Sequence, residues 1–100
     1  MSRVNYNGLN ILFQIDEDEV FVKASAGKKE LGHAYLINSG DYLMPQDLEV
    51  KDRYQGQGIA KTLYDFITSK GYKIRRSNNQ TPAGAAFWNK HNPESNIWLV

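Results

Sequence analysis

A chain of 100 residues with 41% hydrophobic and 23% charged side chains has the composition of one globular domain with a single modest core. The absence of cysteine excludes disulfides, thiolate metal sites and a cysteine nucleophile, and no apolar run approaches the ~18 residues of a membrane-spanning helix. With a net charge of +1 and no apolar segment at the start, we expect a soluble, cytoplasmic protein that does not bind membranes.

The charge is unevenly distributed along the chain. Residues 1–50 carry four basic and eight acidic side chains, a net charge of −4, whereas residues 51–100 carry eight basic and three acidic ones, a net charge of +5. If the two halves contact different ligands, the second half suits an anion and the first half suits a cation.

The first half of the chain has the alternating, β-branched and aromatic pattern of strands. Charged or glycine-containing turns separate four such segments, which cover residues 9–15, 20–25, 33–38 and 42–50. Pro45 places a bulge or a sheet edge in the fourth segment. We therefore expect an antiparallel meander.

The hydrophobic period changes after residue 58. Ile59, Leu63, Phe66 and Ile67 recur at the spacing of one helical face, and Gly71 ends the run. We expect a helix that begins at Ile59 and buries this face.

Two further strands and a second helix are expected in the remaining chain. Residues 72–77 and 96–100 have strand patterns, and Thr81 followed by Pro82 is typical of a helix start, with the helix running to His91. The predicted fold class is therefore α+β: a mostly antiparallel mixed sheet covered by two helices.

The stretch "RYQGQGIAK" between the fourth strand and the first helix contains two glycines at the predicted helix start. A helix N-terminus offers free backbone N–H groups and the positive end of the helix dipole, and glycine lets an anion approach closely. Phosphate is the natural ligand. The spacing of a nucleotide-binding P-loop is absent, and Lys61 breaks the dinucleotide-binding glycine pattern.

Gln55-x-x-Gly58-x-Ala60 resembles the acetyl-CoA signature of the GCN5-related N-acetyltransferases, and Arg53-x-x-Gly56-x-Gly58 satisfies the same pattern. The order of the predicted strands and helices is also similar to that of the family. The resemblance therefore implies the fold of this family. It further implies acetyl-CoA as co-substrate, with pantetheine amides paired to the strand at Leu48 and Val50. The residues that it implies around the pyrophosphate are Gln55, Gly56, Gln57, Gly58, Ile59, Ala60 and Lys61. Additional charge for the adenosine 3′-phosphate is expected from Arg53, Arg75 and Arg76.

Transfer of an acetyl group to an amine needs a neutral nitrogen, yet a lysine amine with a pKa of ~10.4 is only about one part in a thousand neutral at pH 7. A general base is therefore expected, and Asp47 and Glu49 share one face of the strand before the glycines. By alternation Pro45 lies on the same face. The pattern leaves open which face meets the acceptor. Direct attack on the thioester is the simplest mechanism in a chain without cysteine.

The chain departs from the family pattern in two places. Trp88 stands where many members have a tyrosine that acts as the general acid, so the thiolate leaves through water, or Tyr64 or His91 serves instead. About four residues join the first two predicted strands, where members insert two helices that cover the acceptor site. An open, acidic acceptor surface suits a protein lysine or a polyamine.

Two other functions are compatible with the sequence. A non-catalytic acyl-CoA-binding module would keep the glycine motif without the acid. A nucleic-acid-binding domain is disfavoured because its basic residues are few; they would be Lys70, Lys73, Arg75 and Arg76, with Tyr72 for stacking. No metal site is expected, since His33 and His91 have no ligand motif around them. The strand that ends at Val100 makes a dimer conceivable.

Overall fold

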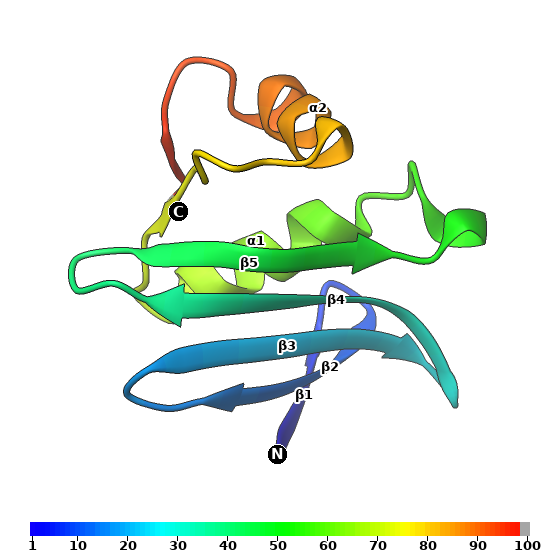
Figure 1. Ribbon diagram of the computed structural model, residues 1–100. Helices are drawn as coiled ribbons and strands as arrows, with labels where there is room; N and C mark the ends of the chain where they lie inside the picture. The colour runs from blue at the N-terminus through cyan, green and yellow to red at the C-terminus, as the bar shows by residue number, and fades with distance from the viewer. Residues whose placement is uncertain (99–100) are drawn as a thin grey trace.

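The computed structural model describes residues 1–98 as an α+β fold with a curled seven-stranded sheet and two α-helices (Figure 1). Neither of these helices is long and apolar enough to cross a membrane. The strands are β1 (Ser2–Tyr6), β2 (Leu9–Ile15), β3 (Glu19–Ala26), β4 (Lys29–Asn38), β5 (Leu43–Val50), β6 (Ile74–Arg75) and β7 (Ile97–Trp98). The helices are α1 (Ile59–Ser69) and α2 (Pro82–His91), and a 3₁₀ turn, Asp52–Tyr54, follows β5.

The strands lie in the sheet in chain order. Each pair from β1 to β5 is antiparallel, β5 and β6 are parallel, and β6 and β7 are antiparallel, so the predicted meander and mixed sheet are confirmed. Strand β6 is shorter than the predicted 72–77, and β7 begins one residue later than predicted; the end of the predicted strand, residues 99–100, lies outside the described residues. The suggestion of a dimer through Val100 lies there as well.

Strand β1 was not predicted from the sequence. It pairs with β2 across a two-residue turn in which Asn7 and Gly8 both have positive φ, 51° and 81°. Positive φ at both central positions defines the hairpin turn that matches the twist of its strands, and Asn-Gly is its preferred sequence. The dipeptide was the signal that could have identified this strand.

Helix α1 covers one face of the sheet, where it packs against β3, β4 and β5. Its predicted apolar face is confirmed, because Ile59, Leu63, Phe66 and Ile67 are all buried. The buried apolar residues of the chain form one cluster around this helix, together with the core-facing residues of the strands. That cluster holds the start of α1 in a fixed position next to the end of β5.

Helix α2 lies beyond the β5 edge rather than over the sheet (Figure 1). It is fixed by aromatic contacts: Phe87 stacks on Trp98 with ring centroids 5.5 Å apart, and Trp88 is 1% exposed. The predicted start of the helix is confirmed, since the Thr81 Oγ1 accepts a hydrogen bond of 3.1 Å from the Gly84 N–H. The expectation that both helices cover the sheet therefore holds for α1 only.

A bulge interrupts the alternation of β5. Asp47 pairs with Tyr35 and Pro45 pairs with Leu36, so Gln46 is the extra residue. Leu36 is fully buried on the core side, and Pro45 lies beside it. The expectation that Pro45 shares a face with Asp47 was wrong, because strict alternation does not hold across a bulge.

Candidate functional site

A cavity of about 440 Å³ lies where the end of β5, the start of α1 and one side of α2 meet. Eight of the nine residues expected to contact a cofactor line it; Gln57 is the exception, and its side chain points to the Arg53 carbonyl oxygen, 3.5 Å away. The opposite wall comes from α2 and includes Gly84, Phe87 and His91. The volume falls within the range of small-molecule sites.

Six consecutive backbone N–H groups next to this cavity have no protein partner among residues 1–98. The amides of residues 56–61 donate to no acceptor among residues 1–98, and the first helical hydrogen bond of α1 runs from the Thr62 N–H to the Gly58 oxygen at 2.9 Å. They lie at the positive end of the helix dipole. The start of α1 therefore has the donors that an anion requires.

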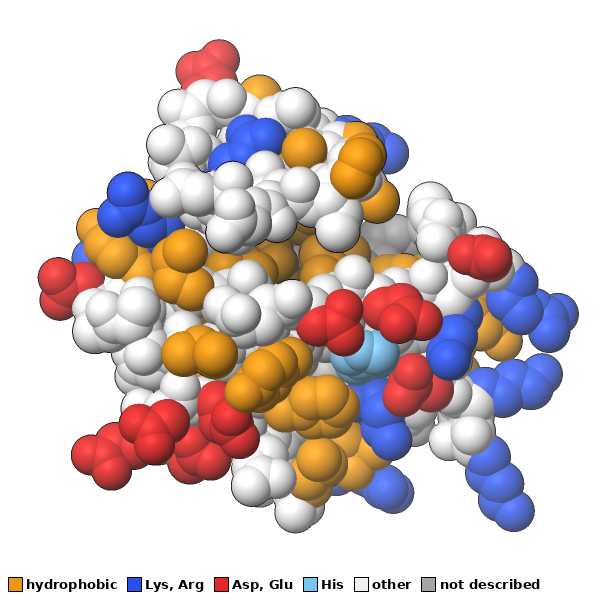
Figure 2. Space-filling model, viewed as in Figure 1, with side chains coloured by type: hydrophobic (Ala, Val, Ile, Leu, Met, Phe, Trp, Pro, Cys, Tyr) orange, Lys and Arg blue, Asp and Glu red, His pale blue; other side chains and the backbone are white. Residues whose placement is uncertain are grey.

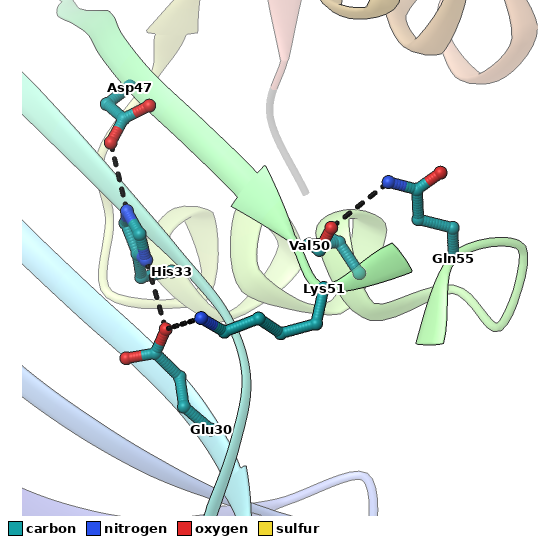
Figure 3. A network of polar contacts seen from close by, with 6 residues as sticks. All are labelled: Glu30, His33, Asp47, Val50, Lys51 and Gln55. Atoms are coloured by element: carbon teal, nitrogen blue, oxygen red, sulfur yellow. Dashed lines mark hydrogen bonds and ion pairs between the residues drawn. The ribbon is translucent and has the colours of Figure 1, made fainter. Parts of the chain in front are cut away.

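The two glycines of this segment are needed for their backbone conformation. Gly56 and Gly58 have φ of 79° and 80°, which side-chain-bearing residues rarely adopt, while the space where a Cβ would sit is open in both. The Gln55 side chain fixes the same segment, because its Nε2 donates to the Val50 oxygen at 3.1 Å (Figure 3). The same Nε2 also donates to the Asp52 carboxylate at 3.2 Å. Gln55 thus ties the turn to the end of β5.

A second cavity of about 120 Å³ adjoins the first. Leu48, Gly84 and Phe87 line both, and the smaller one extends to the β5 bulge at Gln46 and Asp47. Together the cavities follow the edge of β5 from the start of α1 to the bulge. Phe87 packs against the core cluster and also forms a wall of both cavities.

Tyr64 and the residue at the usual acid position, Trp88, both border the smaller cavity but are buried. Trp88 is in the core, and its Nε1–H donates to the Ser95 oxygen at 2.8 Å. Tyr64 lines the smaller cavity but is only 2% exposed, and its burial raises the pKa of its phenol far above the usual 10. A phenol in this environment is a poorer proton donor than an exposed one.

The candidate bases Asp47 and Glu49 lie on the open face of the sheet, which no helix of residues 1–98 covers. Strand pairing places Asp47 opposite Tyr35 and Glu49 opposite His33, so the predicted shared face of the two carboxylates is confirmed. In Figure 2 acidic side chains lie beside a histidine on this face. The carboxylate of Asp47 also reaches the wall of the smaller cavity.

His33 is a member of this group that the sequence did not indicate. Its Nε2 is 2.9 Å from the Asp47 Oδ2 and its Nδ1 is 3.4 Å from the Glu30 Oε2, while the Lys51 Nζ is 3.7 Å from Glu30 (Figure 3). Burial lowers the pKa of His33, but the hydrogen bonds and charges of Asp47 and Glu30 outweigh it and leave the pKa above 6.5. The absence of a sequence motif around His33 was misleading, because its partners come from neighbouring strands.

The basic residues contribute unequally to the cavity. Lys61 lines it, as does Lys90, which was not predicted, whereas Arg75 and Arg76 do not. The Arg76 Nε donates instead to the Gln80 Oε1 at 2.7 Å. His91, the other alternative for the general acid, also lines the cavity, and burial, Lys90 and Lys61 lower its pKa below 6.5 and favour the neutral form.

Comparison with known proteins found no matching family model, no similar curated protein and no similar solved structure.

Proposed function

We propose that the protein is an acetyl-CoA-dependent N-acetyltransferase that acts on a primary amine of a protein lysine or a polyamine. The observation that carries the proposal is the run of six unpaired N–H groups at residues 56–61, which borders a cavity that continues along β5 to the Asp47 carboxylate, on the same face of the strand as Glu49. Backbone donors suit a pyrophosphate, the apolar walls suit the pantetheine chain, and the carboxylates suit an amine.

The resemblance to the GCN5-related N-acetyltransferases supports the same function. Residues 48–61 contain the signature, and the cavity brings its members together with α2. In this proposal the fold is that of the family without the helices that cover the acceptor site. The open sheet face next to the carboxylates leaves room for an amine carried on a protein.

The proposed reaction needs few groups from the protein. Asp47 or Glu49 accepts a proton from the acceptor ammonium, directly or through water, and the neutral nitrogen attacks the thioester carbonyl carbon. The carbon–sulfur bond then breaks, the acetyl group stays on nitrogen, and the second proton that the nitrogen loses passes through water to the CoA thiolate. The base releases its proton to solvent, and the products are an amide and free CoA.

A non-catalytic acyl-CoA-binding module is the second candidate. One observation favours it: the side chain at the usual acid position, Trp88, is buried and hydrogen-bonded to the backbone, and Tyr64 has a strongly raised pKa. Such a module would use the same cavity without turnover.

The two candidates are separated by calorimetric titration with acetyl-CoA and with CoA, followed by assay of free thiol after addition of spermidine or a lysine-rich protein. Micromolar binding with acceptor-dependent thiol release supports the transferase. Binding without release from any acceptor supports the module, and absence of binding to both compounds contradicts both functions.

A further inference from the structure

Three side chains on the open sheet face bring metal-ligating atoms together next to the smaller cavity. One atom each from His33, Asp47 and Glu49 lies within 4.8 Å of the other two. His33 comes from β4, and the two carboxylates come from β5 on either side of Leu48. Zn²⁺ binds imidazole and carboxylate at about 2.0–2.2 Å, so donors around one ion lie about 3–4 Å apart. Small side-chain rotations bring the three atoms into that range.

The imidazole of His33 is already held in the orientation that a metal ligand needs. Its Nε2 points at Asp47, 2.9 Å away, while its Nδ1 is turned to the Glu30 carboxylate at 3.4 Å. Histidines that bind metals almost always donate their other ring N–H to a carboxylate, carbonyl or water, which fixes the tautomer and the ring. Lys51, 3.7 Å from Glu30, in turn holds that carboxylate.

Neighbouring residues fix the ring and leave the ligand side accessible. The Phe21 ring stacks on the imidazole with centroids 6.0 Å apart. Lys23 is the register partner of His33 on β3, whereas Glu49 is its partner on β5, so this ammonium and the carboxylates flank the ring from opposite sides. The Asp47 side chain is 57% exposed, which provides a path for an ion.

We propose that His33, Asp47 and Glu49 form a binding site for a divalent transition-metal ion of the Zn²⁺ class, with Glu30 as the residue that orients His33. A neutral imidazole and two carboxylates supply a charge of −2 against the +2 of the ion, and one nitrogen with two oxygens suits Zn²⁺ better than Ca²⁺ or Mg²⁺, which prefer oxygen alone. Three protein ligands leave a position for water. The site does not depend on the proposed acetyltransferase activity.

The test is calorimetric titration of the full chain with Zn²⁺ after chelator treatment, in a buffer that does not bind zinc and at a pH at which His33 is neutral. One ion per chain is expected. The same solution gives a proton NMR spectrum in which the imidazole signals of His33 shift on addition of Zn²⁺ while those of His91 do not.

Three variants test the ligands and the residue that orients His33, and two more serve as controls. His33→Gln and Asp47→Asn should each weaken Zn²⁺ binding by at least about tenfold, and Glu30→Gln should weaken it by about 10–100-fold although it is not a ligand. His91→Gln and Glu17→Gln, the other histidine and a carboxylate in the β2–β3 turn, are matched controls that should bind as the wild type does.

Three results would overturn the proposal: no binding by the wild type, an unshifted His33 signal in the presence of saturating Zn²⁺, or equal loss of affinity in Glu17→Gln and Asp47→Asn. The NMR observation uses the unaltered chain, so it decides the question even if a variant does not fold.

Discussion

Leu43 pairs with Ile74 at the first residue of β5, and in the part of the chain that the structure describes this is the single register pair between β5 and β6. From there to Val50 the edge of β5 has no strand partner among residues 1–98. Both cavities lie along this stretch, and Leu48 contributes to each. The early separation of two neighbouring strands thus creates the groove that the proposed function requires.

Leu48→Trp should therefore block the groove while the fold is kept. The added volume enters the cavities rather than the core, and we expect acetyl-CoA to bind roughly tenfold or more weakly, by analogy with the ~1–3 kcal/mol cost of overpacking a filled site. Met44→Trp is the matched control, since Met44 lies on the same strand and lines neither cavity. Calorimetric titration measures both; equal affinities in the two variants would contradict the assignment of the groove.

Ala60→Glu tests the anion site at the start of α1. Ala60 lines the larger cavity in the first turn of α1. The helix dipole stabilises a carboxylate at this end of the helix, so the substitution should not lower the stability of the fold. A bound phosphate would be repelled by about 1–4 kcal/mol at ~4 Å, depending on the local dielectric, and CoA affinity should drop by tenfold or more. Ala60→Gln has the same shape without the charge and should bind nearly normally. The difference between the two should shrink at high salt; a difference that persists there would argue against charge repulsion.

Glu49→Gln tests the proposed base. We expect turnover to fall by about 10²–10⁴-fold with little change in acetyl-CoA affinity, because the change removes a proton acceptor and preserves shape. Chelator in the assay excludes any contribution from a metal bound by the same carboxylate. Asp47→Asn measured in parallel identifies which carboxylate acts. Normal turnover in both variants would leave no side-chain base on this face.

Tyr64→Phe distinguishes a structural from a catalytic phenol. The Tyr64 ring contacts Phe87 and Trp98 with centroids 5.5 and 5.3 Å apart, and phenylalanine keeps both contacts. Since burial raises the pKa of Tyr64, we expect turnover to be retained. A decrease of about 10²–10⁴-fold without loss of stability would instead identify Tyr64 as the general acid.

The parts of the fold that the sequence predicted are those encoded locally. The helical period of α1, the cap at Thr81 and the glycine-rich turn each depend on residues within a few positions of one another. Eight of the nine predicted cofactor residues line one cavity for the same reason, because they belong to one strand end, the turn that follows it and the start of α1.

The parts that escaped prediction depend on pairing between distant segments. The bulge at Gln46 becomes visible only when β5 is aligned with β4, and it reverses the face on which Pro45 lies. His33 meets Asp47 across that same pairing, 14 residues away, so no spacing rule could indicate their contact. Lys90 and Phe87 reach the cavity only because the aromatic contacts of α2 place this helix beyond the sheet edge.

His91 links the pH dependence of stability to the larger cavity. Burial, Lys90 and Lys61 lower its pKa in the folded protein, so the folded state binds this proton more weakly than the unfolded state. Well above pH 6.5 the titration of His91 should not affect stability. As the pH falls from 6.5 through the lowered pKa that His91 has in the folded protein, stability should decrease.

The His91 effect is measured as the difference in urea-unfolding free energy between the wild type and His91→Gln, in which the opposite contribution of His33 cancels. The wild type should lose stability relative to the variant below pH 6.5, and a difference that does not vary with pH would contradict the shift.

Because His91 lines the larger cavity, a bound polyanion should add negative charge nearby and raise the pKa of His91. NMR titration of the His91 imidazole with and without CoA tests this; an unchanged pKa with CoA bound would place the phosphates elsewhere.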